Sequence, residues 1–293
     1  MYSCNQRANI FMNKTLRIVM IAIAALLTLS FAESPQKIKR VVADDGYRLV
    51  FSDEFNLPNG SQPDSTKWSR CKRYDSMWNR WISASKDVVF IKNGKLVCRA
   101  IPNIKEKGDT AKMLTGAIET IRKFSFQYGR VDIRLKTNLL RGNFPAAWMK
   151  PEVIDPNKYG EIDIFESFGD QGIAQQTIHN HTSVIFKKDI DKGKFKTDID
   201  LDKWHVYSLV WTPTELIFLI DDLVTGRFFK SLDKKQLKLG QWTFDRPFYL
   251  ILNQSVGDGR FKWLNVDTNN NYETQFDWVR VYKKSKYYGN KCI

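Results

Sequence analysis

Alternating apolar and polar residues, in strand-length segments separated by turn residues, constrain the fold of this chain most. The clearest case is 131–136, Val-Asp-Ile-Arg-Leu-Lys, which is apolar on one side and charged on the other. Asn93-Gly94 separates two further apolar segments, and this dipeptide is the strongest short-range signal for a β-hairpin. Segments 216–220 and 248–252 are apolar throughout, as in strands buried on both faces.

Helical periodicity is weak in comparison. No segment keeps a 3.6-residue period for more than two turns, and the best candidate is 233–239. Alternating strands must bury their apolar faces against a second sheet. The sequence therefore predicts an all-β protein built as a two-sheet antiparallel sandwich, and 293 residues suit one large domain of this class.

The N-terminal residues have the pattern of an export signal. Basic residues precede the apolar run 18–27, and small residues stand where a signal peptidase cutting after Ala32 would bind them. The run of roughly 15 residues is shorter than the about 20 that a membrane anchor needs. We expect residues 1–32 to be a removed signal peptide. The protein would then be periplasmic, on the cell surface or extracellular, with no membrane span left.

The charge balance is strongly basic. The formal net charge of +14 becomes +11 without the predicted signal peptide, which favours anionic surfaces or substrates. The basic pairs 187–188, 234–235 and 283–284 are scattered along the chain. Scattered pairs are typical of solvated loops and not of a nucleic-acid-binding stripe, so no nucleic-acid partner is expected.

Cysteine usage permits at most one internal disulfide. Cys71, Cys98 and Cys292 remain after removal of the leader. Cys98 shares a predicted strand face with Leu96 and is expected to be a buried thiol. Cys71 with Cys292 is the pair to test. The sequence contains no Cys/His spacing of a zinc site, so no metal ligand is assigned from spacing.

One segment, Gly-Glu-Ile-Asp-Ile-Phe-Glu, concentrates carboxylates on a single predicted strand. Glu161 and Asp163 point to the same face because the strand period is two. Glu166 breaks this parity, and on a regular strand it would enter the core, where an unpaired carboxylate is costly. A β-bulge, with one extra residue at Ile164 or Phe165, returns Glu166 to the acidic face.

This geometry suits glycoside hydrolysis. The backbones of Glu161 and Glu166 would lie about four strand steps apart, or roughly 13 Å. Side chains leaning inward would bring the two carboxyl groups to about 5 to 5.5 Å, as in retaining glycosidases. Crowding raises the proton affinity of one carboxyl group and so supplies the acid. Asp163 is too short for either role and is expected to hold the nucleophile. The alternative is a solvated strand face, but three like charges side by side disfavour it.

The motif Glu-Ile-Asp-Ile-Phe-Glu resembles the Glu-x-Asp-x-x-Glu signature of glycoside hydrolase family 16, in its bulge-containing form. Other segments resemble, in order, the opening strand of the family, its cleft loop, the strand after the catalytic one, and the closing strands. They are 51–55, 143–148, 204–212, 248–253 and 276–282.

The resemblance implies a β-jelly-roll sandwich with a substrate cleft on its concave face. It implies endo-acting cleavage of β-1,3 or β-1,4 links in a polysaccharide or glycan, with retention of configuration. Glu161 would be the nucleophile, Asp163 its electrostatic helper and Glu166 the acid/base. No cofactor is required by this reaction. Family members often hold a structural calcium ion on the convex side, where Asp277 matches a ligand position.

The same resemblance predicts the domain boundaries. An N-terminal extension at 33–46 would precede a catalytic domain at 47–285, and a short tail at 286–293 would follow it. A monomer is expected.

Five residues are predicted to contact the sugar chain. Trp148 is the first candidate, because the apolar C–H face of a pyranose stacks on an aromatic ring. Trp78 and Trp81 lie in a loop-like stretch and are further candidates. His179 closely follows the acidic strand and is expected to face it. Asn253 stands at the polar end of an apolar strand. Core packing remains the alternative for the tryptophans, and a structural role for the histidine.

Several functions remain open at this point. Substrates of the family include β-glucans, sulfated galactans and host glycans, and the basic charge favours an anionic chain. The loop 142–145, Gly-Asn-Phe-Pro, departs from the Trp-Pro of the β-glucanases that it resembles. A non-catalytic carbohydrate-binding jelly roll is a rival from another class, but a pure binder does not need a paired nucleophile and acid. A transglycosylase would use the same residues.

Overall fold

The clearest predicted strand, 131–136, lies inside β6 (Gly129–Thr137) of the computed structural model. Its three apolar residues are completely buried, whereas Arg134 and Lys136 are partly exposed. The alternation in the sequence is therefore an alternation between the core and the outer face of the sheet, as the two-residue period predicts. On that outer face Asp132 is nevertheless buried, in an ion pair with Arg130.

The structure describes residues 46–104, 106, 108–260 and 264–284. The predicted signal peptide, nearly all of the predicted N-terminal extension, the C-terminal tail and Cys292 lie outside the described residues. Among those described, no helix has both the length and the apolar character needed to span a bilayer.

The predicted hairpin at Asn93-Gly94 is confirmed. It joins β3 (Val89–Ile91) to β4 (Leu96–Pro102), and the two strands pair antiparallel. Both turn residues have positive φ angles, 53° and 68°, as a two-residue type I′ turn requires.

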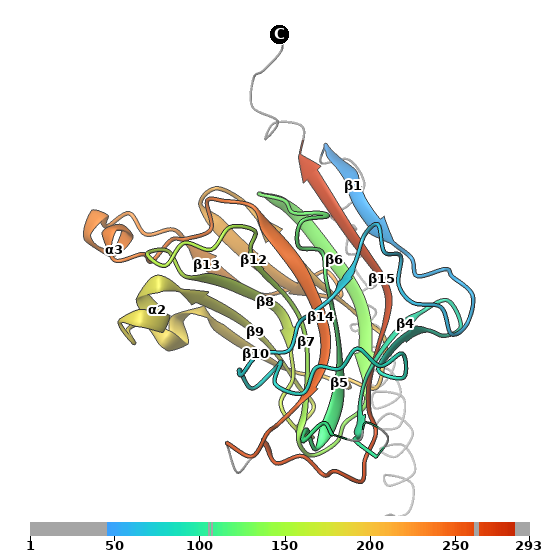
Figure 1. Ribbon diagram of the computed structural model, residues 1–293. Helices are drawn as coiled ribbons and strands as arrows, with labels where there is room; N and C mark the ends of the chain where they lie inside the picture. The colour runs from blue at the N-terminus through green and yellow to red at the C-terminus, as the bar shows by residue number, and fades with distance from the viewer. Residues whose placement is uncertain (1–45, 105, 107, 261–263, 285–293) are drawn as a thin grey trace, which may run out of the picture. The chain divides into compact units, whose positions relative to one another are not determined.

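One antiparallel layer, here called the β8 layer, contains the acidic segment. Its order is β10-β9-β8-β7-β14-β5, with β2 beside β5. Figure 1 shows its long strands lying side by side and curving together. The strands are β10 (Lys194–Asp198), β9 (Ile173–Asn180), β8 (Gly160–Glu166), β7 (Asn143–Pro151), β14 (Phe248–Val256), β5 (Met113–Glu119) and β2 (Ser69–Arg70).

The second antiparallel layer, here called the β6 layer, has the order β4-β15-β6-β11-β12-β13. β3 pairs with β4, and β1 pairs with β15. The strands not yet given are β15 (Tyr272–Lys284), β11 (His205–Trp211), β12 (Glu215–Ile220), β13 (Leu223–Phe229) and β1 (Tyr47–Asp53).

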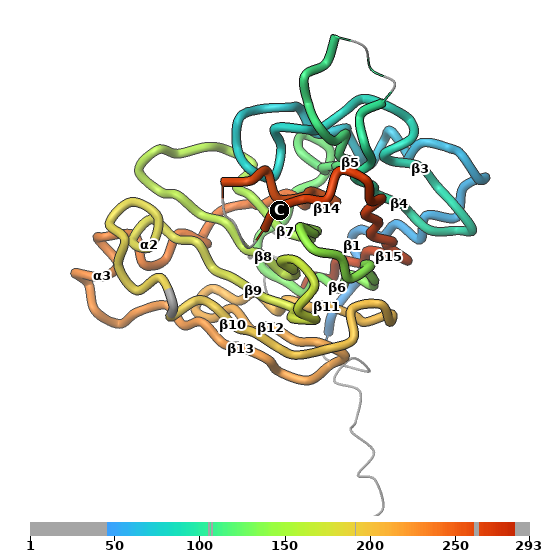
Figure 2. The backbone as a smooth tube through the Cα atoms, turned by 90° about the horizontal axis from the view of Figure 1, so that it is seen from below, coloured from blue at the N-terminus to red at the C-terminus, as the bar shows by residue number. Residues whose placement is uncertain are grey.

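The two layers meet along both edges. On one side β4 pairs directly with β5, with Ala100 opposite Thr115. On the other, Gly226 of β13 lies against the ring of Phe195 in β10, so closely that an added Cβ would stand 2.2 Å from a ring carbon. Figure 2, turned by 90° from Figure 1, shows the strand order bending back on itself at β10 and β13. The predicted two-sheet sandwich is confirmed, in a nearly closed form.

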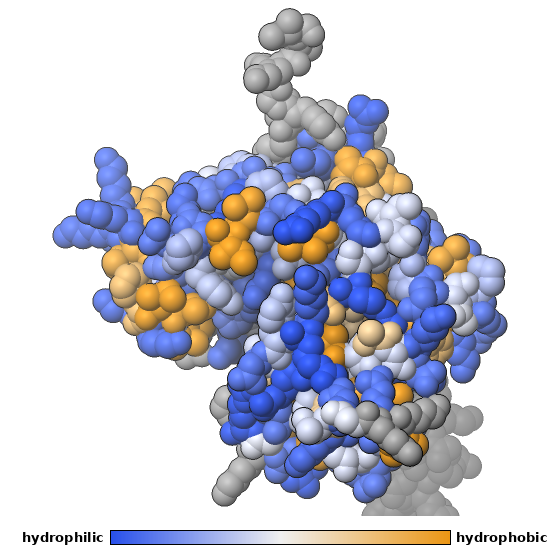
Figure 3. Space-filling view, in the orientation of Figure 1, coloured by the Kyte–Doolittle hydropathy of each residue, from blue (hydrophilic) through white to orange (hydrophobic). Residues whose placement is uncertain are grey.

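The main apolar core fills the space between the layers. Trp68 and Trp211 belong to it, with 3% and 1% of their surface exposed. Within the part of the chain that the structure describes, the named helices are α2 (His181–Ile185), the 3₁₀ turn η1 (Ile190–Gly193) and α3 (Lys234–Lys238). Figure 3 shows apolar side chains gathered over the region of α2 and α3, where Ile185 and Leu232 are exposed.

Candidate active site

The acidic segment forms β8, and the predicted bulge is confirmed. Thr177 and Gln175 of β9 lie opposite Asp163 and Glu166, so three steps on β8 match two on β9. On the other side, Ala147 and Trp148 of β7 pair with Phe165 and Asp163, so that Ile164 is the extra residue. A β-bulge of this kind changes the face to which all following side chains point.

The bulge separates carboxylates from apolar side chains. Ile162, Ile164 and Phe165 are all completely buried in the core between the layers. Glu161 and Glu166 stay partly exposed on the outer face of the β8 layer. All three apolar residues thus contribute to the core while both glutamates remain accessible to a substrate.

Glu161 is held by two groups that sequence reasoning missed. The hydroxyl of Tyr159 donates a hydrogen bond of 2.9 Å to Oε2 of Glu161. Nζ of Lys150, from β7, lies 3.6 Å from the same oxygen. Burial first, and then the charge of Glu161, raise the pKa of Tyr159, so the phenol stays a proton donor.

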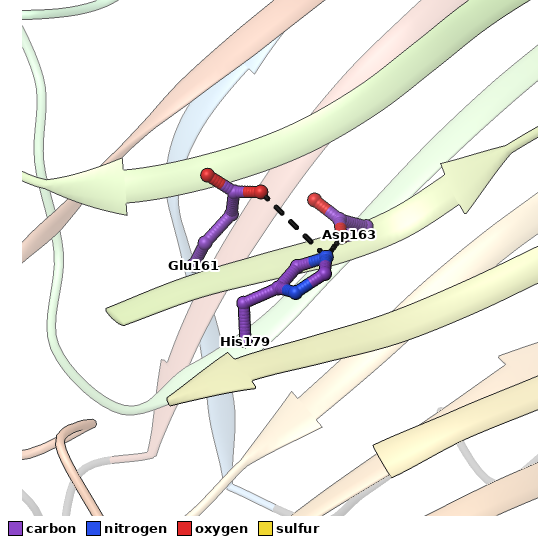
Figure 4. A group of neighbouring side chains, drawn as sticks. All are labelled: Glu161, Asp163 and His179. Carbon is purple, nitrogen blue, oxygen red and sulfur yellow. Dashed lines mark ion pairs between the residues drawn. The ribbon is translucent and has the colours of Figure 1, made fainter. Parts of the chain in front are cut away.

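His179 stands directly opposite Glu161 across the pair β8 and β9, as predicted. Figure 4 shows its ring pointing toward both Glu161 and Asp163. Its Nε2 lies 3.1 Å from Oδ2 of Asp163 and 3.8 Å from Oε1 of Glu161. Oδ2 makes no hydrogen bond within the described structure, so the contact with His179 is close but not aligned.

Glu166 has the environment of a proton donor. Burial of its carboxyl group raises its pKa well above the usual value, and the charge of Asp163 raises it further. His179 and a hydrogen bond of 3.2 Å from Thr177 act in the opposite direction. The pKa of Asp163, which is 2% exposed, is also raised strongly, by burial first and by the charge of Glu161 second. Burial and mutual repulsion therefore favour the protonated form of the carboxyl groups at Asp163 and Glu166.

Two groups of side chains bear on metal binding. Glu161, Asp163 and His179 each offer a ligand atom, all within 4.8 Å of one another. Three donors of this kind also serve acid-base chemistry, so they do not by themselves define a metal site. The oxygens of Asp277 face Nζ of Lys95 at 2.6 Å and the guanidinium of Arg134. Two cations on one carboxylate do not suit the oxygen-rich shell of calcium.

Trp148 and Asn253 are not placed as predicted. Trp148 is 4% exposed and Asn253 is completely buried. Nε1 of Trp148 donates a hydrogen bond of 2.8 Å to Oδ1 of Asn253. Both belong to the outer face of the β8 layer, but the loop 71–82 covers them there and forms a second apolar cluster with Trp148. Parity along a strand identifies the face, whereas the covering loop comes from a distant part of the chain.

The other two candidate tryptophans have different positions. Trp78 is partly exposed and packs edge-on against Trp148, with ring centroids 4.8 Å apart. Trp81 packs against a small apolar cluster that includes Met113 and Tyr272. Trp78 therefore remains a candidate for sugar contact, and Trp81 has mainly a packing role.

A large pocket adjoins the Glu161 end of β8. Its volume is about 790 Å³, and its lining includes Lys150, Tyr159 and Gly160, which border Glu161. Trp78 lines it too, together with Tyr249 from β14. Tyr159 could have been found from the sequence, because it lies two residues before Glu161 and an extended chain places such residues on the same side.

Paired glutamates beside a pocket on one layer of a curved β-sandwich match the two carboxyl groups that glycosidases use. The model of glycosyl hydrolases family 16 matches residues 76–280. The chain belongs to this family, and its sandwich is the jelly roll of the family.

Two curated relatives and one solved structure illustrate the similarity. The keratan-sulfate endo-1,4-beta-galactosidase of Sphingobacterium multivorum is 33% identical over 248 residues, which cover 83% of this chain and 56% of that protein. The chain thus spans little more than half of that relative. The beta-glucanase of Rhodothermus marinus is 29% identical, with coverages of 81% and 85%. The structure of SCLam, a non-specific endo-beta-1,3(4)-glucanase from family GH16, is 27% identical, with a TM-score of 0.71 and coverages of 82% and 92%.

Proposed function

We propose that this protein is an exported, endo-acting β-glycoside hydrolase that works by double displacement with retention. The arrangement of Glu161, Asp163 and Glu166 on one bulged strand carries the proposal. Retaining enzymes need two carboxyl groups in distinct protonation states, one to attack and one to protonate. The strongly raised pKa of Glu166 and the donors that hold Glu161 meet this need.

In the first step Glu161 attacks the anomeric carbon while Glu166 gives its proton to the leaving glycosidic oxygen. The bond between carbon and leaving oxygen breaks, and a glycosyl ester of Glu161 forms. That ester has no negative charge, so one of the groups that raise the pKa of Glu166 is lost. Glu166 is then a carboxylate suited to the second step.

In the second step Glu166 removes a proton from water, and the water oxygen attacks the same carbon. The ester bond breaks, Glu161 becomes a carboxylate again, and Glu166 has recovered its proton. Two inversions give net retention. Asp163 lies between the two glutamates on the strand face, and the hydrogen bond that it shares with Glu166 lets it position the acid/base in either step.

For the substrate we propose a β-galactosidic chain cut at internal β-1,4 links. The family relative of 33% identity, named for endo-1,4-beta-galactosidase action on keratan sulfate, supports this choice. The fold similarity to a non-specific endo-beta-1,3(4)-glucanase supports β-glucan as the second candidate. Digestion of keratan sulfate, laminarin and mixed-linkage β-glucan, with product sizes measured, decides between them.

Variants with chemical rescue test the mechanism. Glu161→Ala and Glu166→Ala should both lose hydrolysis and keep their fold, while Glu215→Gln, which breaks a remote ion pair with Arg227, should keep both. With azide and an activated glycoside, Glu161→Ala should form the α-glycosyl azide and Glu166→Ala the β-glycosyl azide. Near-normal hydrolysis by either alanine variant, or α-configured fresh product from the wild type, contradicts the proposal.

A further inference from the structure

The pocket beside Glu161 is strongly basic. Seven basic side chains line it against two acidic ones, Glu119 and Asp155. They come from β2, from β7 and from four connecting segments, so the chain assembles them only by folding. The basic residues are Lys150, described above, with Arg70, Lys72, Arg122, Lys123, Lys158 and Arg246.

Most of this positive charge is uncompensated. The side chains of Lys72, Arg122 and Lys158 are exposed and have no ion-pair or hydrogen-bond partner among the described residues. Arg246 donates to the carbonyl oxygen of Lys158, and its Nε is buried without a partner in the described structure. Several arginines outside the pocket are instead paired with acids: Arg73 with Asp109, Arg99 with Glu273 and Arg280 with Glu54.

The pocket also offers apolar surface of the kind that sugars contact. Tyr74 is 65% exposed, Ile154 is 89% exposed, and both line the pocket together with Trp78. An exposed ring between cations suits a pyranose that carries an anionic group, because the ring contacts the C–H face while the cations bind the charge.

We propose that this pocket binds a sulfate ester on a sugar next to the cleavage point, an inference that rests on the proposed function. A sulfate monoester keeps its charge at every pH at which the protein is folded, and its three terminal oxygens accept bonds from several directions. Separate lysine and arginine donors around a wide pocket suit such a group, whereas a carboxylate is served by one bidentate arginine. Because Tyr159 and Lys150 border both the pocket and Glu161, the sulfated sugar lies beside the nucleophile.

The test uses a triple variant, Lys72→Gln with Arg122→Gln and Lys158→Gln. These side chains are exposed and unpaired, so their replacement leaves the fold intact. The matched control is Lys92→Gln with Lys234→Gln and Lys238→Gln, which removes the same charge from exposed lysines outside the pocket lining. Both sets are made in the full chain with Glu166→Gln, so that the glycan is bound and not cleaved.

Calorimetry then measures binding of keratan sulfate and of the same material after chemical desulfation. The parent and the control should bind the sulfated chain about tenfold more tightly or better, as expected for hydrogen bonds to charged groups. The triple variant should lose this preference, and added salt should weaken only the sulfated complex.

The outcomes separate this inference from the proposed function. Equal affinity of the parent for sulfated and desulfated keratan sulfate overturns the sulfate site. A control variant that loses the preference as fully as the triple variant overturns it too. Both results hold even where the wild type hydrolyses the desulfated glycan. Sulfate-dependent binding without hydrolysis by the wild type supports the site and contradicts the hydrolase. A uronic-acid polymer of equal charge density is the last comparison. If the protein binds it as tightly as keratan sulfate, the pocket is a carboxylate site and the proposal is overturned.

Discussion

Tyr159, the residue immediately before β8, donates its phenolic hydrogen bond to Oε2 of Glu161, two residues further along the chain. Lys150 approaches the same oxygen from β7. The other oxygen, Oε1, accepts no hydrogen bond from the described residues and lies 3.8 Å from His179. One oxygen is therefore anchored and the other is available to attack, which places Tyr159 among the positioning residues of the site.

Replacement of Tyr159 by phenylalanine should lower kcat about ten- to hundredfold. A hydrogen bond to a charged group contributes roughly 1.5 to 3 kcal/mol, and each 1.4 kcal/mol is a factor of ten in rate. Steady-state kinetics on the cleaved glycan measures the effect. Tyr207→Phe is the control, because that buried hydroxyl has no hydrogen-bond partner in the described structure. Equal kcat values for wild type and Tyr159→Phe would remove the positioning role.

The pH profile of kcat/KM should fall on the alkaline side as Glu166 loses its proton. Burial and the charge of Asp163 raise the pKa of Glu166 well above the usual value, so the fall comes later than for an ordinary glutamate. Asp163→Asn removes one of these charges and should move the alkaline limb to lower pH. An unmoved limb in this variant would mean that another group titrates there.

The architecture and the bulge were predictable because they depend on local pattern. Alternation in β6, the Asn93-Gly94 turn and the broken parity at Glu166 each leave a mark within a few residues. The prediction of Ile164 or Phe165 as the extra residue needed only the rule that a buried unpaired carboxylate is costly. The near closure at Gly226 and Phe195 was not predictable, because no short pattern specifies which edges meet.

The surroundings of the site were predicted less well. The loop 71–82 covers Trp148, and nothing near Trp148 in the sequence signals that cover. The basic pocket combines side chains as distant in sequence as Arg70 and Arg246, so the net charge suggested an anionic partner without locating it. Lys150 shares the strand face of Trp148, two residues away, and the same parity rule finds it once the acidic strand is known to be its neighbour.

Asp163→Asn should stabilise the fold while it impairs catalysis. Asp163 is buried and its pKa in the folded state is raised above the ordinary 3.8, so the folded protein binds more protons than the unfolded chain above that pH. The contribution of Asp163 to the free energy of unfolding is therefore fully present at low pH and is lost as the pH rises from near 4. Asparagine cannot ionise, so the variant avoids this loss of stability.

The gain should therefore grow with pH, to about 1 to 3 kcal/mol near neutrality, or about 2 to 4 °C in Tm for each kcal/mol. Thermal unfolding at pH 4, 6 and 8 measures it. If Asp163→Asn is less stable than the wild type at pH 8, Asp163 is not a buried acid whose ionisation destabilises the fold.

Trp148 and Asn253 should behave as a structural pair. Trp148→Phe and Asn253→Ala each remove the buried hydrogen bond and leave a partner unsatisfied, so each should lower the free energy of unfolding by about 1 to 3 kcal/mol. The double variant should lose less than the sum of the single losses. Urea unfolding measures the cycle. Trp78→Ala should instead raise KM, and a large KM effect with no stability loss in Trp148→Phe would restore the sugar-platform role.

Chelation should leave the protein unchanged. The two oxygens of Asp277 are already neutralised by Lys95 and Arg134, and calcium prefers six to eight oxygen ligands. We expect the same Tm and the same rate of glycan cleavage with EDTA and with added Ca²⁺. Asp277→Asn should lower the Tm equally in both conditions, because it leaves the two cations unpaired. If EDTA lowers the Tm of the wild type and Ca²⁺ restores it, a calcium site exists, and if Asp277→Asn abolishes that response, Asp277 is one of its ligands.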